Sequence, residues 1–325
     1  PYSETLGGES AERFGDHPKE IRGFIKGVAG TSPYLKSLID REHLWLNEVL
    51  STSGDVLEQT SKAITIDKNI PLTLRQAKRR IALWVALCDL AGAWSLEEVT
   101  GALSDFADHA VSAALNVAVQ RQAERKKIPG FRADDNPETA GVFVLAMGKM
   151  GAGELNYSSD IDLICLFDDS RFDPADFHDA RSAFIKATRE MSATLNDLTA
   201  EGYVFRTDLR LRPDPSVTPV CIGTDAAERY YESLGRTWER AAYIKARVCG
   251  GDLSAGSAFL KRMQPFVWRK HLDFTAIEDA HNMRLAIRDH KGFGGPITLE
   301  GHNMKLGRGG IREIEYFTQT RQLIS

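Results

Sequence analysis

Residues 146–167 read AMGKMGAGELNYSSDIDLICLF, and this stretch decides the fold. Three glycines and a lysine come first, as in a loop that binds phosphate. Asp160 and Asp162 follow and open an apolar segment of strand length. Another short apolar run, VFVLAM, lies just before the glycines at residues 142–147. The spacing therefore predicts a strand, a glycine-rich loop and a second strand.

The chain on both sides of this unit has mainly helical patterning. Apolar residues recur at helical spacing over residues 32–127, where Ser95 and Glu98 fit the capping box of a helix. Residues 203–213, YVFRTDLRLRP, alternate like a strand that stops at a proline, and helical patterning returns from about Thr224. We predict an α+β fold with a small mixed sheet, flanked by helical subdomains. The predicted divisions are a helical subdomain at 1–130, a catalytic core at 131–255 and a helical segment that completes the active site at 256–325.

Composition limits the classes of partner. The 325 residues include 41 Lys and Arg against 45 Asp and Glu, a net charge of −4. Without a net basic field we expect neither nucleic acid nor a membrane surface as partner, so any recognition of phosphate must be local. No apolar stretch approaches the roughly 18 residues that a membrane helix needs. Four cysteines without CxxC spacing favour reduced thiols and a cytoplasmic protein. The chain starts without methionine, and we expect it to be an excerpt of a longer protein.

The two aspartates of the second strand are candidate metal ligands. Side chains alternate along a strand, so Asp160 and Asp162 project from one side while Ile161 and Leu163 enter the core. Two neighbouring carboxylates repel each other unless a cation lies between them, and oxygen ligands on a rigid edge suit Mg²⁺. If the strand that carries Asp208 lies beside them, three carboxylates could hold two Mg²⁺ ions, with Mn²⁺ as a substitute. Because a D-x-D at a strand start is common without metal, the prediction depends on the joint pattern.

The glycines do not form a known nucleotide-binding motif. A P-loop needs G-x-x-x-x-G-K-[ST] before a helix, whereas Lys149 follows the first glycine, and G-x-G-x-x-G is also missing. Gly148, Gly151 and Gly153 could let backbone amides approach phosphate oxygens, with hydroxyl groups from Ser158 and Ser159 and a charge from Lys149. The alternative is that the glycines only make a tight turn.

A phosphate also needs cationic partners. If the alternation of residues 203–213 continues to its end, two arginines lie on the same strand face as Asp208. A second basic pair follows in the segment YIKAR, and a further lysine lies in the glycine-rich segment 303–310. Each of these residues could instead form an ordinary surface ion pair. The candidate phosphate-binding cations are Arg210, Arg212, Lys245, Arg247 and Lys305.

These residues resemble a known superfamily. The chain resembles the nucleotidyltransferases of the DNA polymerase β type in one motif. The motif consists of Gly148, eleven further residues, Asp160-x-Asp162 and the later Asp208. The longer segments resemble the glutamine synthetase adenylyltransferase family, and they are GKMGAGELNYSSDIDLICLF, FRTDLRLRP, RTWERAAYIKARVCGGD and NMKLGRGGIREIEYFTQTRQLI. The resemblance implies a polymerase-β-like nucleotidyltransferase core.

The resemblance also implies a function. Enzymes of this family carry two similar nucleotidyltransferase domains; one attaches AMP to a tyrosine of glutamine synthetase, and the other removes it by phosphorolysis, giving ADP. The segments GGIREIEY and WERAAYIKAR resemble the removing domain. The implied partners are adenylylated glutamine synthetase, inorganic phosphate, ADP or ATP, and a uridylylated PII signalling protein that acts through the full-length enzyme. The implied catalytic and metal-binding residues are Asp160, Asp162 and Asp208. Two alternatives remain: an ATP-dependent adenylyltransferase, and a non-catalytic nucleotide- or effector-binding module.

Overall fold

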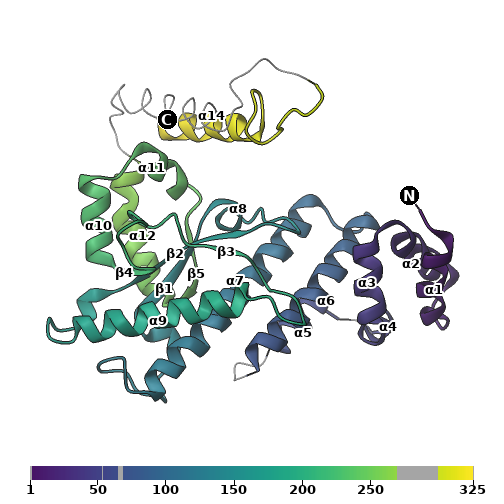
Figure 1. Cartoon of the computed structure of the whole chain (residues 1–325), viewed down its shortest axis with the longest axis horizontal. Coiled ribbons are helices and arrows are strands. Elements are labelled where there is room, and N and C mark those ends of the chain that lie inside the picture. Colours follow the sequence, from purple (N-terminus) through teal and green to yellow (C-terminus); the bar gives the residue numbers. More distant parts are fainter. Residues whose placement is uncertain (1, 53, 65–68, 269–298, 325) are drawn as a thin grey trace.

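The computed structural model describes residues 2–52, 54–64, 69–268 and 299–324, and it places helices around one small sheet (Figure 1). The chain begins with helices, as the apolar spacing predicts. Among the described residues, seven α-helices precede the sheet: α1 (Glu4–Ala11), α2 (Lys19–Thr31), α3 (Pro33–Arg41), α4 (His43–Ser51), α5 (Val56–Lys62), α6 (Ile70–Leu90) and α7 (Leu96–Glu124). The predicted capping box is confirmed, because Ser95 accepts from the Glu98 amide while the Glu98 side chain accepts from the Ser95 amide. In the described residues, no helix combines the length and apolarity needed to cross a membrane.

The predicted strand–loop–strand unit forms the centre of the sheet. Its strands are β1 (Val142–Ala146) and β2 (Ile161–Phe167), and the glycine-rich stretch between them contains the single-turn helix α8 (Gly148–Gly151). The remaining strands are β3 (Thr207–Asp208), β4 (Cys221–Gly223) and β5 (Arg247–Gly251). The strand order is β3-β2-β1-β5, with β4 also paired to β2. Strand β2 is parallel to β3 and β4 and antiparallel to β1, which is antiparallel to β5. The predicted α+β fold with a small mixed sheet is confirmed.

Helices cover both faces of the sheet (Figure 1). On one face, α7 and α9 (Phe177–Asn196) share a hydrophobic core with alternate strand residues such as Val144 and Leu163. On the other face, α10 (Thr224–Ser233), α11 (Thr237–Tyr243) and α12 (Leu253–Val267) pack against the intervening strand residues, including Leu145 and Ile164. The last described helix, α14 (Ile311–Ile324), joins this second core through Leu323. This alternation of strand residues follows from the two-residue period of a strand.

The prediction of a strand over residues 203–213 is wrong except at two residues, because β3 ends at Asp208. The Asp208 carboxylate accepts from the Arg210 amide at 2.8 Å and turns the backbone away from the sheet. Arg212 then stabilises the turned segment, since its guanidinium donates to the carbonyls of Leu209, Pro215 and Thr218. Arg210 and Arg212 therefore do not continue the strand face of Asp208.

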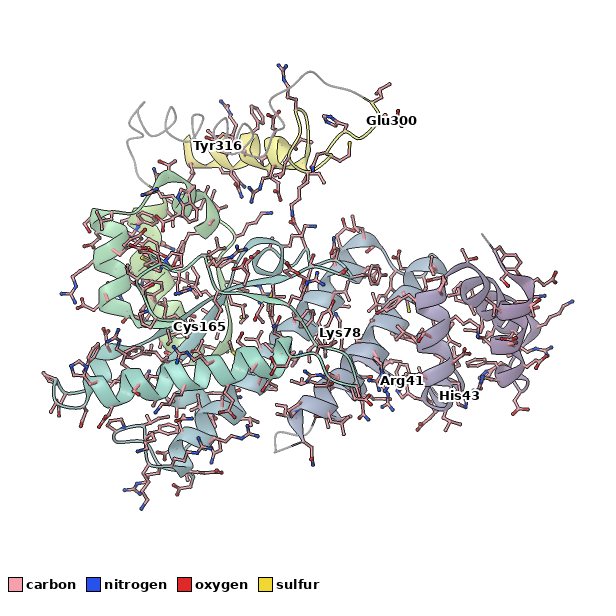
Figure 2. All side chains as sticks on the ribbon, viewed as in Figure 1. Arg41, His43, Lys78, Cys165, Glu300 and Tyr316 are labelled. Carbon is pink, nitrogen blue, oxygen red and sulfur yellow. The ribbon has the colours of Figure 1, made fainter. Side chains whose placement is uncertain are left out.

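One lysine of α6 is enclosed by aromatic rings. The Lys78 Nζ lies 4.1 Å from the centre of the Phe205 ring and 5.9 Å from that of Phe106. Figure 2 labels Lys78 between the N-terminal helices and the sheet. Burial disfavours the charged amine and lowers the pKa of Lys78 to about 8 from 10.5. The folded chain therefore releases this proton at a lower pH than the unfolded chain does.

This difference predicts a pH dependence of stability. Between about pH 8 and pH 10.5 the unfolded chain holds the Lys78 proton and the folded chain does not, so this group makes the free energy of unfolding rise with pH. We expect wild type to gain about 2 kcal/mol relative to Lys78→Met between pH 8 and pH 10, since one pKa unit corresponds to about 1.4 kcal/mol. Urea unfolding at a series of pH values measures the difference. Lys62→Met, which changes an exposed lysine paired with Glu58, is the control. Parallel curves for wild type and Lys78→Met would contradict the prediction.

Candidate active site

The three predicted acids lie at one end of the β2–β3 pair. Asp162 is the register partner of Asp208, so two carboxylate-bearing residues are direct neighbours on parallel strands. Asp160 precedes β2, and the Ile161 amide that follows it donates to the carbonyl of Arg206 at 2.9 Å. The strand of Asp208 lies beside β2, which is the condition that the three-acid hypothesis required. Strand alternation places Ile161 in the core, as predicted.

The charges around Asp162 favour a cation. Burial raises the pKa of the Asp162 carboxyl, and the neighbouring carboxylates of Asp208 and Asp160 raise it further. Arg210 and Lys305 act in the opposite direction. A divalent cation beside Asp162 would relieve the repulsion among the three acids, and carboxylate oxygens are the ligands that Mg²⁺ prefers. The donor set therefore fits the predicted metal by its chemistry.

Asp208 already interacts with an arginine. The Arg210 Nε donates to both carboxylate oxygens of Asp208, each at 3.0 Å, and its Nη2 also donates to Oδ2. This guanidinium lowers the pKa of the Asp208 carboxyl and holds it ionised. The Arg210 side chain is 83% exposed, so it lies on the solvent side of Asp208.

Asp160 interacts with Arg206, a residue that the sequence analysis missed. The Arg206 Nε donates to Asp160 Oδ1, its Nη1 donates to the Tyr203 hydroxyl at 2.8 Å, and its Nη2 donates to the Ser158 carbonyl at 3.0 Å. One signal in the sequence could have found it. Arg206 precedes Asp208 by two residues, and residues two apart in a strand lie on the same face, so Arg206 is expected on the face that carries Asp208.

These arginine contacts affect the predicted metal centre. In the ranges that the structure describes, no group of three His, Cys, Asp or Glu side chains is arranged to hold a metal ion. The physical reason lies in the outer acids: Asp160 is directed at Arg206 and Asp208 at Arg210. Asp162 and Asp208 still form the pair best placed for a cation, and Asp160 would need to turn from its arginine to join them.

The glycine turn lies directly against Asp162. Gly148 has φ +55°, and a Cβ built there would lie 2.8 Å from Asp162 Oδ2. The Met147 amide donates to the Asp162 carbonyl at 2.9 Å, which fixes the turn beside β2. At Gly151 a Cβ would lie 2.0 Å from the Lys245 carbonyl, so this glycine permits close packing of two backbone segments. Both positions thus require glycine for structural reasons, and the close approach of Gly148 to Asp162 links the turn to the acids.

The remaining predicted phosphate ligands differ in whether their side chains already form ion pairs or hydrogen bonds within the described residues. Arg247 donates to both oxygens of Asp108 and to the Met150 carbonyl, and thereby joins β5 to α7 and α8. Lys245 pairs with Glu154 at 3.2 Å and lies 3.8 Å from Glu315. These contacts give both residues a structural role.

Two lysines have no such engagement. Within the described part of the chain, the ammonium groups of Lys149 and Lys305 make no hydrogen bond or ion pair, and Lys305 acts electrostatically on Asp162. Ser159 donates to the Asn156 side chain at 2.5 Å, while Ser158 contributes its carbonyl to Arg206. Lys149 and Lys305 are the predicted cations most available to an anion.

The segment that leads into β3 is fixed by α6. Arg75 is 1% exposed and donates to the carbonyls of Gly202 at 2.7 Å, Thr194 at 3.1 Å and Asp197. These carbonyls belong to the last turn of α9 and to the loop after it, so Arg75 joins α6 to both segments. Glu201 of the same loop pairs with Arg79 and Arg41. The helical layer thereby determines where the chain enters β3 and positions Asp208.

This arrangement is the one expected of a nucleotidyltransferase. Two acids lie at a strand start, a third lies opposite them on the neighbouring strand, and a glycine turn packs against the central acid. Comparison with known proteins agrees with this class. Residues 24–262 match the family model described as glutamate-ammonia ligase adenylyltransferase. The chain belongs to the glutamate-ammonia ligase adenylyltransferase family. A shorter match, over residues 280–325, is to the model described as GlnD PII-uridylyltransferase.

Curated relatives carry the corresponding name. The chain is 47% identical over 312 residues to the bifunctional glutamine synthetase adenylyltransferase/adenylyl-removing enzyme of Bradyrhizobium sp. (strain BTAi1), covering 94% of this chain and 32% of the relative. It is 52% identical over 319 residues to the enzyme of the same name in Rhizobium meliloti (strain 1021), again covering 94% and 32%. The chain thus spans about a third of the length of these relatives.

Proposed function

We propose that this chain removes AMP from the adenylylated tyrosine of glutamine synthetase by phosphorolysis, yielding ADP, and that its sheet is a polymerase-β-like nucleotidyltransferase core. The observation that carries the proposal is the register of Asp162 with Asp208 against the Gly148 turn. The names of the relatives include both an adenylyltransferase and an adenylyl-removing activity. The removing direction is supported by the resemblance of GGIREIEY and WERAAYIKAR to that domain.

The proposed reaction is a displacement at phosphorus. An oxygen of inorganic phosphate forms a bond to the α-phosphorus of the AMP group, and the bond to the tyrosyl oxygen breaks. ADP leaves, and the tyrosyl oxygen takes up a proton. Phosphate carries anionic oxygens at neutral pH, so the attack needs no strong base. A tyrosine hydroxyl has a pKa of about 10, so its departure depends on stabilising the charge that develops.

The residues have distinct proposed roles in this step. Asp162 and Asp208 would hold Mg²⁺, or Mn²⁺ in its place, with Asp160 as a further ligand; a bound cation would neutralise phosphate oxygens. For Asp160 to act as a ligand, its carboxylate would have to turn from Arg206. Lys149 and Lys305, whose ammonium groups have no ion-pair partner among the described residues, would attract the two phosphate groups.

Partners beyond the substrate belong to the proposal as well. We expect a PII signalling protein to act through the longer enzyme, which fits the match of residues 280–325 to a family whose description includes PII. We also expect the activity in the cytoplasm, in agreement with four free cysteines.

A direct assay tests the direction of the reaction. Incubating the chain with AMP-tyrosyl glutamine synthetase, Mg²⁺ and phosphate should yield ADP in amounts that match the AMP lost from the protein, and omission of phosphate should abolish it. Chromatography of the nucleotides measures the product. If ADP is absent while ATP labels unmodified glutamine synthetase, the chain is instead the adenylyltransferase that the names of its relatives also include. If neither reaction occurs and nucleotide still binds, the chain is a binding module.

A further inference from the structure

We propose that Arg206 is a phosphate-binding residue of this site and that its guanidinium passes from Asp160 to a phosphate oxygen when a divalent cation engages Asp160. This inference rests on the proposed function for the identity of the anion, the attacking phosphate. The geometry that carries it is the set of three contacts of Arg206: a carboxylate, a tyrosine hydroxyl and a backbone carbonyl.

The contact of Arg206 with Asp160 is easily exchanged. The two side chains are 48% and 56% exposed, and ion pairs this accessible contribute about 0–1 kcal/mol in water. A divalent cation attracts Asp160 more strongly than one guanidinium does, because it carries twice the charge in a smaller volume. Cation binding at Asp160 would therefore release the Nε–H of Arg206.

The other contacts keep the released guanidinium at the site. Its Nη1 donates to the Tyr203 hydroxyl at 2.8 Å and its Nη2 to the Ser158 carbonyl at 3.0 Å, and the group lies 5.6 Å from the centre of the Tyr203 ring. A guanidinium has five N–H donors, so two remain for another acceptor even while all three contacts persist. After release from Asp160, three donors in a planar fork are available, which suits the oxygens of a phosphate.

The neighbouring arginines are less suited to this role. Arg212 donates to three carbonyls, and Arg247 is bound to Asp108 and a further carbonyl. Arg210 is bound through three N–H···O contacts to Asp208, and within the described residues its guanidinium has no other hydrogen-bond partner to hold it once released. Arg206 combines an exchangeable partner with two fixed contacts.

The test measures phosphate and cation affinity separately in the full 325-residue chain. Arg206→Gln should raise the KM for phosphate in ADP formation, and the calorimetric Kd for phosphate in the presence of Mn²⁺, by about 10- to 100-fold, the effect of losing one charge-assisted hydrogen bond. The Kd for Mn²⁺ should stay the same or fall, since Asp160 loses a competing partner. Arg206→Lys, which keeps the charge without the fork, should give an intermediate value.

The matched control is Arg229→Gln. Arg229 lies on α10 in an exposed ion pair with Asp225, so this variant should leave both affinities unchanged. Thermal unfolding of each variant checks that the fold persists. An unchanged phosphate affinity in Arg206→Gln would overturn the inference, and so would parallel losses of Mn²⁺ and phosphate affinity, which indicate that Arg206 only shapes the acids. If wild type forms no ADP while the binding results are as expected, the proposed function fails and the Arg206 subsite stands.

Discussion

Asp162→Asn should lower kcat for ADP formation on the order of 1,000-fold while the fold persists. Asn has the same size but no charge, so the pair with Asp208 would lose the carboxylate that lies deepest in the site. A cation held by the remaining acids would be bound weakly and out of position, and charge stabilisation of this kind supplies much of the rate in phosphoryl transfer. Steady-state kinetics at saturating phosphate measures the loss.

The stability of Asp162→Asn should not fall with its activity. A charged Asp162 lies half-buried beside two other carboxylates, and its neutral replacement removes that repulsion. The melting temperature of Asp162→Asn should therefore equal or exceed that of wild type. Asp225→Asn, on the exposed surface of α10, is the control and should change neither quantity. Activity of Asp162→Asn above a tenth of wild type would rule out the acid pair as the catalytic centre.

Gly148→Ala should lower both activity and stability. The residue has φ +55°, so a methyl group costs about 1–2 kcal/mol of backbone strain, and the new Cβ would lie 2.8 Å from Asp162 Oδ2. The carboxylate must shift to make room. Because a misplacement of about 1 Å in a catalytic group can cost about 100-fold in rate, we expect kcat to fall 10- to 100-fold. Urea unfolding and steady-state kinetics measure the two effects.

The same loop offers a matched control. Gly153 has φ +71°, and a Cβ built there meets no atom within 4 Å. Gly153→Ala therefore carries a similar backbone strain without touching Asp162, and it should lose stability but retain its kcat. Equal activity in the two variants would show that the contact with Asp162 is unimportant for the reaction.

The predictions that were confirmed depended on local patterns. The strands on either side of Gly148, and the side of β2 on which the two aspartates lie, follow from alternation over a few residues. The adjacency of the strand of Asp208 to β2 was only a condition of the three-acid hypothesis, and the structure meets it. The catalytic and metal-binding roles of these acids remain predictions.

The features that the sequence did not reveal depend on distant partners. Arg247 looked available to phosphate, but its carboxylate partner Asp108 lies 139 positions away in the chain. The predicted strand was longer than β3 because alternation alone cannot reveal the turn that ends it. That turn is formed by the Asp208 side chain and stabilised by Arg212. Arg206 and Arg75 were missed for a similar reason, since the contact of Arg206 with Asp160 spans 46 positions and that of Arg75 with Gly202 spans 127.

The shared core beneath the sheet limits how the enzyme can be dissected. Val111 and Leu115 of α7 are fully buried in the same cluster as Val144 and Leu163 of the strands. A minimal catalytic fragment that begins at residue 131 would expose this apolar face to water and lose the Arg75 contacts that precede Asp208. The smallest fragment that retains the acids in register must therefore include α6 and α7.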